Sequence, residues 1–482
     1  MKYTLMTGAT GLLGAYVLRD NLAAGQRLAL LVRSSRLESA RQRVESILAR
    51  FEKESERPLS RPVVLEGDLT KPAGGLDADA LRWVAKNCDR VLHNAASLSF
   101  YHDEKTGEPY RSNVEGTKNT LQLCRETGTR QFHHVSTAYI CGLRSGTCLE
   151  SELDMGQRFG NDYERTKVEA EQLVRAADFI DPPTFYRPSI IVGDSKTGYT
   201  SSYHGFYTPL KIAQGVIGNS SIPTIDGLPI LSALGLSGGE QKNFVPVDWV
   251  SAAMTHVLSQ PDRWGQTYHL VPRNRVTVKT ATRVLEDALR RFHPSEDVVR
   301  STAVKEWSFS PELFREQMLT YRAYWRNDPV FDYRNTTAAA PHLPCPIVHY
   351  AMLMRMALFA LGSAFGWPRP QPMVPACDVA EKLAPLLSRN SAAGGNGALS
   401  LGLQINGRGG GQWTLFMEGD TVSAARCGLP TDDRILVYLS SDTVVRLSER
   451  TTSVSQVLSS GAVHAEQQGG RYELNQQLVE NV

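Results

Sequence analysis

Close to its first residue the chain reads Thr7-Gly8-Ala9-Thr10-Gly11-Leu12-Leu13-Gly14, directly after the apolar run 3–6. Three glycines at this spacing, between a predicted strand and a predicted helix, are typical of a turn that binds the pyrophosphate of a dinucleotide. Gly8 permits the tight turn, Gly11 lets the backbone approach the phosphates, and Gly14 allows helix and strand to pack closely. Since the N-terminus of the helix would face the phosphates, we expect a dinucleotide site here.

Short β-rich runs continue along the chain at the spacing of β-α-β units. They cover residues 3–6, 27–32, 63–66, 90–93, 131–135 and 184–186. Helix-length segments separate these runs, which predicts a parallel sheet with helices on both faces. The predicted fold class is α/β, a doubly wound Rossmann-type parallel sheet with a smaller substrate-capping region and a C-terminal α+β module.

Changes in composition predict three parts of the chain. Residues 1–345 form the nucleotide-binding part, in which about 198–243 and 280–345 cap the substrate cleft. Residues 346–390 are a helical and proline-rich connector. Residues 390–397 read as a flexible linker. Residues 391–482 hold six Arg, no Lys and nine acidic residues, so this mildly acidic tail is predicted to be a separate module.

Charge and cysteine content restrict the classes of partner and compartment. The 482 residues include 52 Lys or Arg and 50 Asp or Glu, and a net charge of +2 does not indicate nucleic acid as a partner. Seven cysteines without a Cys-x-x-Cys pair are interpreted as reduced thiols, and no metal site is expected. The N-terminal residues lack the pattern of a secretory signal, so we expect a cytoplasmic protein.

The longest apolar stretch covers residues 347–367, but His349 and Arg355 interrupt it. Its uninterrupted part is too short for the roughly 20 residues that a bilayer span needs. Two interpretations stay open. The stretch is either a helix buried between domains or an interfacial helix that gives peripheral contact with a membrane.

The ends of the second and third strand runs carry the residues that would meet the adenosine half of a dinucleotide. The second ends in Leu31-Val32-Arg33, where a carboxylate would accept the ribose hydroxyls of NAD. A guanidinium suits the 2′-phosphate of NADP, so we expect NADPH. Arg43 is either a second contact or part of a solvated helix face, and Asp68 is expected near the adenine amino group.

Tyr163 and Lys167 are four residues apart in a predicted helix and therefore share one face. A free tyrosine has a pKa of about 10, and the Lys167 ammonium together with a positive nicotinamide ring would favour the phenolate. Tyr163 could then protonate the oxygen of a carbonyl that accepts a hydride. Ser136 and Thr137 follow a predicted buried strand, and either hydroxyl could hold that oxygen, with Thr137 in the better register.

The N-terminal part resembles an extended short-chain dehydrogenase/reductase, and within that superfamily the thioester reductase and fatty acyl-CoA reductase branch. The matching motifs lie within about residues 3–280: Leu31-Val32-Arg33, Glu66-Gly67-Asp68-Leu69, His93-Asn94-Ala95-Ala96, Asn113-Val114-Glu115-Gly116-Thr117, His134-Val135-Ser136-Thr137, Tyr186-Arg187-Pro188-Ser189-Ile190-Ile191-Val192-Gly193 and Val245-Pro246-Val247-Asp248.

The resemblance implies an NADPH-dependent reductase of a hydrophobic acyl thioester, forming an aldehyde or an alcohol. It implies that Thr137, Tyr163 and Lys167 are catalytic. It also implies cofactor contacts from Gly8, Thr10, Gly11, Leu12, Leu13, Gly14, Arg33, Asp68, Leu69, Asn94, Ala95, Ala96, Tyr163, Lys167, Pro188 and Ser189. Asn113 would order the active-site helix or a water near Lys167.

Residues from about 397 to 482 resemble a sterol carrier protein 2-like domain. The resemblance is carried by Gly411-Gln412-Trp413-Thr414-Leu415, Asp442-Thr443-Val444 and Ser460-Gly461-Ala462-Val463. Such a domain would enclose an apolar tunnel, whereas an unrelated α+β module would serve for stability or dimerisation. No acyl-activating or carrier domain is expected, so a thioester would arrive on coenzyme A or on a separate acyl carrier protein.

Two other functions stay open. One is an NADPH-dependent reductase of a ketone, a quinone-like compound or a hydroxysteroid. The other is a nucleotide-sensing lipid carrier without catalysis. The presence of Thr137, Tyr163 and Lys167 together argues against the carrier, because a sensor needs no proton donor beside the nicotinamide.

Overall fold

A computed structural model shows how the chain folds. It describes residues 2–55, 59–217, 236–292, 325–367, 378–387, 399–407, 409–418, 421–428, 435–467 and 470–472.

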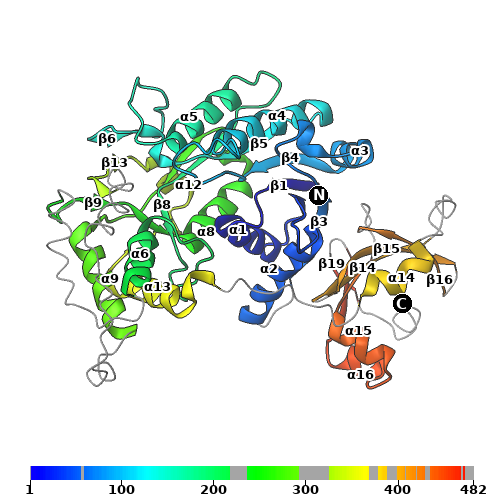
Figure 1. The fold of residues 1–482 in the computed structure, drawn as a ribbon. Helices are drawn as coiled ribbons and strands as arrows, with labels where there is room; N and C mark the ends of the chain where they lie inside the picture. Colours follow the sequence, from blue (N-terminus) through cyan, green and yellow to red (C-terminus); the bar gives the residue numbers. More distant parts are fainter. Residues whose placement is uncertain are drawn as a thin grey trace, which may run out of the picture.

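A seven-stranded parallel sheet forms the centre of the N-terminal part (Figure 1), with the strand order β11-β7-β5-β4-β1-β2-β3. Its strands are β1 (Tyr3–Thr7), β2 (Leu28–Val32), β3 (Val63–Glu66), β4 (Cys88–His93), β5 (Gln131–Val135), β7 (Thr184–Pro188) and β11 (Thr267–Leu270). The chain moves outward from β1 in one direction and then returns to β4 on the other side. This reversal creates a crevice at the carboxyl ends of β1 and β4, the usual ligand site of such sheets.

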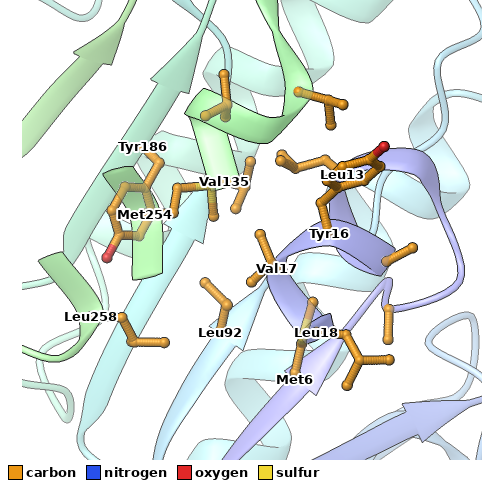
Figure 2. Close-up of a cluster of buried hydrophobic side chains, with 14 of the residues drawn as sticks. Met6, Leu13, Tyr16, Val17, Leu18, Leu92, Val135, Tyr186, Met254 and Leu258 are labelled. Carbon is orange, nitrogen blue, oxygen red and sulfur yellow. The ribbon is translucent and has the colours of Figure 1, made fainter. Parts of the chain in front are cut away.

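Helices cover both faces of this sheet. One face carries α1 (Leu12–Ala23), α2 (Ala40–Ser55) and α8 (Val247–Leu258), and the other carries α3 (Ala78–Asn87), α4 (Gly116–Thr127) and α5 (Asp162–Arg175). Figure 2 shows the first core, where Val17 and Met254 from the helices pack on Leu92 and Val135 from the strands. The predicted doubly wound α/β fold is confirmed.

Strand β11 was not among the predicted runs. Its four residues, Thr-Tyr-His-Leu, alternate polar and apolar side chains over a length too short to distinguish a strand. All four are nevertheless buried, because the sheet edge is covered by α12 (Arg334–Ala339). This burial depends on a segment more than sixty residues away along the chain.

Smaller elements pack beside the carboxyl end of the sheet. They include the strand pairs β8 (Ile190–Val192) with β10 (Phe244–Pro246), β9 (Gln241–Lys242) with β12 (Val276–Thr277), and β6 (Thr147–Cys148) with β13 (Val330–Phe331). They also include the helices α6 (Thr208–Ile217) and α9 (Val278–Phe292). Residues 218–235 and 293–324 of the predicted cap lie outside the described residues.

The apolar stretch 347–367 contains the helix α13 (Tyr350–Gly362), which packs against α9. Its buried side chains, Leu353 and Met356 among them, belong to one core with Val284 of α9. This packing agrees with the buried-helix interpretation. Among the described residues, no helix has both the length and the apolar character that crossing a membrane requires.

The C-terminal residues form a second sheet with the strand order β16-β15-β14-β17-β18-β19. Its elements are β14 (Leu399–Asn406), β15 (Gly411–Glu418), β16 (Thr421–Cys427), β17 (Ile435–Ser440), β18 (Val463–Gln467) and β19 (Gly470–Tyr472), with the helices α14 (Val379–Leu387), α15 (Ser441–Ser448) and α16 (Val454–Ser459). The strands β14 and β15 pair antiparallel on either side of the glycines at 407, 409 and 410. The C-terminal α+β module is therefore confirmed as part of the fold.

Candidate active site

The loops that follow the parallel strands enclose a cavity of about 520 Å³. The residues that the sequence assigned to catalysis or cofactor contact all line it: Gly8, Thr10, Gly11, Leu12, Leu13, Gly14, Arg33, Asp68, Leu69, Asn94, Ala95, Ala96, Thr137, Tyr163, Lys167, Pro188 and Ser189. They come from the ends of six strands and from the helix α5, so the tertiary fold brings together residues that are up to 181 positions apart in the sequence.

The glycine-rich turn packs tightly against the loop after β4. Gly8 has a φ of +72°, and a Cβ atom there would lie 2.6 Å from the backbone nitrogen of Ala95. A Cβ atom at Gly14 would lie 1.9 Å from the carbonyl oxygen of Gly8. Both positions therefore require glycine. No side chain caps the N-terminus of α1, so its first N–H groups are left for a ligand, as a phosphate cradle requires.

Two arginines lie side by side at one end of the cavity, Arg33 after β2 and Arg43 on α2. Arg43 donates to the Arg33 carbonyl oxygen at 2.6 Å and to the Thr10 hydroxyl at 3.0 Å. Burial and the positive charge of Arg33 lower the pKa of Arg43. Arg43 thus faces the cavity, and an anion bound beside it would relieve the repulsion between the two guanidinium groups.

Asp68 follows β3 on the same wall. Its Oδ1 accepts hydrogen bonds from the amide and the hydroxyl of Thr70, each at 2.9 Å. Burial raises the pKa of Asp68, but these hydrogen bonds and the charge of Arg33 outweigh burial, so the pKa is lowered. The side chain is therefore a fixed, ionised acceptor at neutral pH.

The helix α5 carries Tyr163 and Lys167 one turn apart. Asn161 caps its N-terminus by accepting the Glu164 amide at 2.9 Å. Lys167 is 2% exposed, and its Nζ donates to the carbonyl oxygen of Val135 at 2.7 Å. Thr137 stands just beyond β5 and donates to the Pro188 carbonyl oxygen at 3.3 Å.

Burial determines the acidity of both α5 side chains. It raises the pKa of Tyr163 to about 12, although a hydrogen bond with Thr137 lowers it. Burial also lowers the pKa of Lys167 to about 8, against the opposing effect of Glu171. The sequence predicts that Lys167 together with a positive nicotinamide ring favours the phenolate. In the structure the protein's own groups instead keep Tyr163 protonated at neutral pH.

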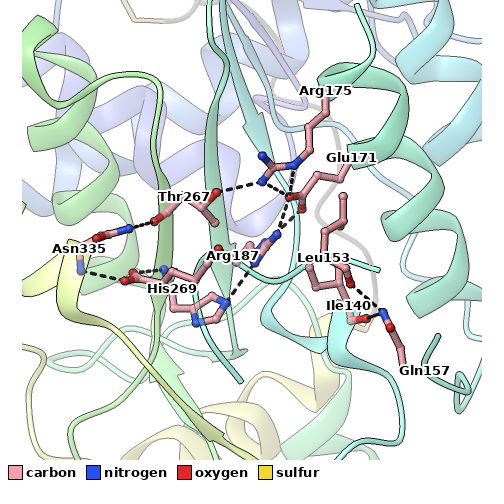
Figure 3. A network of polar contacts seen from close by, with 10 residues as sticks. Ile140, Leu153, Gln157, Glu171, Arg175, Arg187, Thr267, His269 and Asn335 are labelled. Atoms are coloured by element: carbon pink, nitrogen blue, oxygen red, sulfur yellow. Dashed lines mark hydrogen bonds and ion pairs between the residues drawn. The ribbon is translucent and has the colours of Figure 1, made fainter. Parts of the chain in front are cut away.

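A buried ion pair that the sequence motifs do not predict lies beneath these residues (Figure 3). Glu171, one turn beyond Lys167 on α5, contacts Arg187 of β7 at 2.6 Å, and both side chains have no exposed surface. Arg175 adds a hydrogen bond to the same carboxylate at 2.8 Å. This pair fixes α5 against the strand that ends at Pro188. Its signal in the sequence was Arg187 in an otherwise apolar strand run.

Three further polar side chains surround the reactive residues. Among the described residues, the buried hydroxyls of Ser136 and Ser189 have no hydrogen-bond partner, and both residues line the cavity. Such hydroxyls are suited to bind a polar ligand group. Asn113 donates to the Thr166 hydroxyl on α5 at 3.0 Å, which agrees with its expected role in ordering the helix.

The described residues show the state of the cysteines and the placement of possible metal ligands. The cysteines that the structure describes are free thiols. Cys377 lies outside the described residues. Within the described ranges, no three His, Cys, Asp or Glu side chains are grouped as metal ligands would be.

Known proteins resemble this chain over part of its length. Aldehyde reductase lnaA of Aspergillus flavus is 27% identical over 369 residues, which cover 70% of this chain and 34% of that protein. Fatty acyl-CoA reductase wat of Drosophila melanogaster is 27% identical over 248 residues, which cover 45% of this chain and 48% of that protein. The chain therefore spans a third to a half of the length of these relatives.

A solved structure supports the fold. The crystal structure of the terminal R domain from the myxalamid PKS-NRPS biosynthetic pathway superposes with a TM-score of 0.58 at 24% identity. The match covers 76% of this chain and 92% of that domain. The model of an NAD-binding family described as male sterility protein matches residues 6–254, more than half of the chain. With its glycine-rich turn at the head of the matched region, this chain belongs to that family.

Proposed function

We propose that the protein is an NADPH-dependent reductase that converts a hydrophobic acyl thioester to an aldehyde or an alcohol. The observation that carries this proposal is the convergence of Thr137, Tyr163 and Lys167 on the cavity that also holds the glycine-rich turn. The names of an aldehyde reductase and a fatty acyl-CoA reductase among the relatives support the substrate class.

The residues fit a dinucleotide along the whole cavity. The turn at Gly8 and the uncapped α1 would hold the pyrophosphate, and Arg33 with Arg43 would hold the 2′-phosphate that distinguishes NADPH from NADH. The unpartnered hydroxyl of Ser189 lies at the end where the nicotinamide would be bound. A reduced nicotinamide there would supply the hydride for reduction.

Tyr163 would act as the general acid. Its raised pKa keeps the phenol protonated, which reduction requires, because the thioester oxygen takes up a proton as its carbon gains the hydride. Thr137 would hydrogen-bond that oxygen, and the charge of Lys167 would stabilise the phenolate that Tyr163 becomes. The resulting hemithioacetal then loses its thiol as the carbon–sulfur bond breaks, which leaves the aldehyde.

The other parts of the proposal concern delivery of the substrate. The acyl group would arrive on coenzyme A or on a separate acyl carrier protein. We propose that the residues 391–482 act as a sterol carrier protein 2-like domain for an apolar ligand. The buried apolar face of their sheet is compatible with such a domain.

Turnover with identified products tests the proposal. Purified protein is incubated with NADPH or NADH and a series of acyl-CoA thioesters, and the products are identified by mass spectrometry. We expect oxidation of NADPH with release of free coenzyme A and formation of aldehyde or alcohol. Turnover of ketones or quinones but of no thioester would contradict the proposed reduction of acyl thioesters and would favour the alternative of a ketone reductase.

A further inference from the structure

A second tyrosine, Tyr139, lines the cavity close to the reactive residues. It lies in a short helical turn, residues 138–141, two positions after Thr137. Its backbone amide donates to the Thr137 hydroxyl at 3.3 Å, so the two side chains are placed by one local structure. The Tyr139 ring is partly exposed, whereas its neighbours in that turn are buried.

The hydroxyl of Tyr139 is bound to a residue 189 positions away in the sequence. It donates to Asp328 Oδ2 at 2.6 Å. The Asp328 side chain is 3% exposed and forms an ion pair with the buried Lys242 at 2.6 Å. The backbone amide of Asn243 donates to the same Asp328 oxygen at 2.9 Å. Asp328 is therefore a fixed, fully bonded acceptor.

A neighbouring aromatic ring also holds the Tyr139 ring in place. Phe331 packs against it edge-on, with 5.7 Å between ring centroids and an interplanar angle of 77°. Residues 241–243 and 325–331 come from the two segments predicted to cap the substrate cleft. Both segments thus meet at Tyr139, where the cap joins the wall of the cavity.

We propose that Tyr139 is a specificity-determining residue that limits the bulk of the substrate beside the reacting carbonyl. The proposal rests on the proposed function. Thr137 would hold the carbonyl oxygen, so a ring placed two residues later by the same turn lies next to the α-carbon of the acyl group. Because Asp328, Lys242 and Phe331 hold this ring, it cannot turn aside to admit a branch.

Isomeric substrates test this proposal. Octanoyl-CoA and 2-ethylhexanoyl-CoA are isomers, and the second carries an ethyl branch at the α-carbon on a main chain two carbons shorter. Octanal and 2-ethylhexanal form the matching aldehyde pair. We expect wild type to prefer the linear isomer. Tyr139→Ala should raise the ratio of kcat/KM for branched over linear substrate by at least about tenfold, the lower end of the effect of one methylene group in an apolar pocket. Tyr139→Leu should give a smaller shift in the same direction.

Three controls distinguish the proposed steric role of Tyr139 from other roles. Tyr139→Phe keeps the ring and its packing on Phe331 but removes the hydrogen bond to Asp328, so it should shift the ratio less than Tyr139→Ala. It should retain turnover because Tyr139 is not the acid. Tyr333→Ala removes a tyrosine that does not line the cavity and should also leave the ratio unchanged. NADPH affinity within about twofold of wild type would show that each variant is folded.

The outcomes are distinguishable. An unchanged ratio in folded Tyr139→Ala and Tyr139→Leu would overturn the proposal. Turnover of the aldehydes but not of the thioesters would contradict the thioester function, while the aldehyde pair would still test Tyr139. No turnover of either series by wild type would contradict both proposals.

Discussion

At the scale of single residues, the two tyrosines Tyr139 and Tyr163 differ in their hydrogen-bond partners. Tyr139 donates to a carboxylate that is itself paired with Lys242, whereas Tyr163 has a hydroxyl beside Thr137 and lies one helical turn from Lys167. Both line the same cavity. A proton can leave Tyr163 toward a substrate, while that of Tyr139 is shared with Asp328.

Replacing Tyr163 by Phe removes the proposed acid and little else. General acid catalysis contributes about 10²–10⁴-fold, so we expect kcat to fall by that range. NADPH affinity, measured by fluorescence titration, should stay within about threefold of wild type because the ring remains. Unchanged turnover would exclude Tyr163 from the mechanism, and it would leave the nucleotide-sensing carrier as an alternative.

The pH dependence should report Lys167. Its pKa of about 8 means that the ammonium is present below pH 8 and is lost as the pH rises through that value. We expect kcat/KM to decline above about pH 8. In Lys167→Arg the charge persists because a guanidinium stays protonated, so its weaker activity should stay level over this interval. Identical pH profiles for the two proteins would contradict this assignment.

Cofactor preference should depend on Arg33. Arg33→Ala removes one of the two guanidinium groups at the adenosine end, so we expect the KM for NADPH to rise by about 10- to 100-fold, as for a lost charge-assisted hydrogen bond. The KM for NADH should change little, since it has no 2′-phosphate. Arg36→Ala, a change at an arginine that does not line the cavity, provides the control. A parallel rise for both cofactors would exclude recognition of the phosphate.

At the scale of elements, the ion pair between Glu171 and Arg187 joins α5 to β7. Burial alone would raise the pKa of Glu171, but Arg187 and Arg175 hold it below its ordinary value. The pair therefore stabilises the fold at neutral pH. This contribution is lost as the pH falls below the ordinary carboxylate range, about 4.

Glu171→Gln leaves Arg187 buried without a charged partner. We expect the free energy of unfolding at pH 7 to fall by about 3–5 kcal/mol, measured by urea denaturation. The loss should shrink at acidic pH, where wild type has lost the same charge. Asp79→Asn, in an exposed pair with Arg82, should have little effect. Equal stability of Glu171→Gln and wild type at pH 7 would show that the pair does not hold the two elements.

At the scale of the whole molecule, the chain builds its cores separately. The side chains of the two cores on the parallel sheet come from residues between positions 3 and 345. Those of the core on the C-terminal sheet come from residues between positions 379 and 465. Contact between the two parts includes a hydrogen bond from Gln404 Nε2 of β14 to the carbonyl oxygen of Leu59, which precedes β3, at 3.2 Å. Damage to one core should therefore leave the other largely folded.

Trp413→Ala tests this independence. Trp413 is 3% exposed in the C-terminal core, and removing its ring should cost about 3–5 kcal/mol. We expect faster hydrogen exchange in β14, β15 and β17, with unchanged exchange in β1 and β4 and unchanged NADPH affinity. Trp367→Ala, at a tryptophan that is 72% exposed, should alter neither region. Loss of protection throughout the chain would mean that the two parts unfold as one.

How much the sequence predicted depended on the range of the interactions involved. The turn at Gly8, six of the strands of the parallel sheet and the one-turn spacing of Tyr163 and Lys167 are local patterns, and the sequence showed them without a structure. The effect of burial on the pKa of Tyr163 was not predicted, because only Lys167 and the nicotinamide ring were considered. Desolvation depends on every atom packed around the phenol, which spacing alone does not reveal.

The sequence by itself determined six strands of the parallel sheet, the glycine-rich turn and the residue types that could carry the chemistry, because each of these follows from a few neighbouring residues. Only the tertiary structure decided that Arg187 pairs with Glu171 and that Asp328 holds Tyr139. The physical reason is that a buried charge needs a partner, and the partner is whichever residue the packing of distant segments brings within reach.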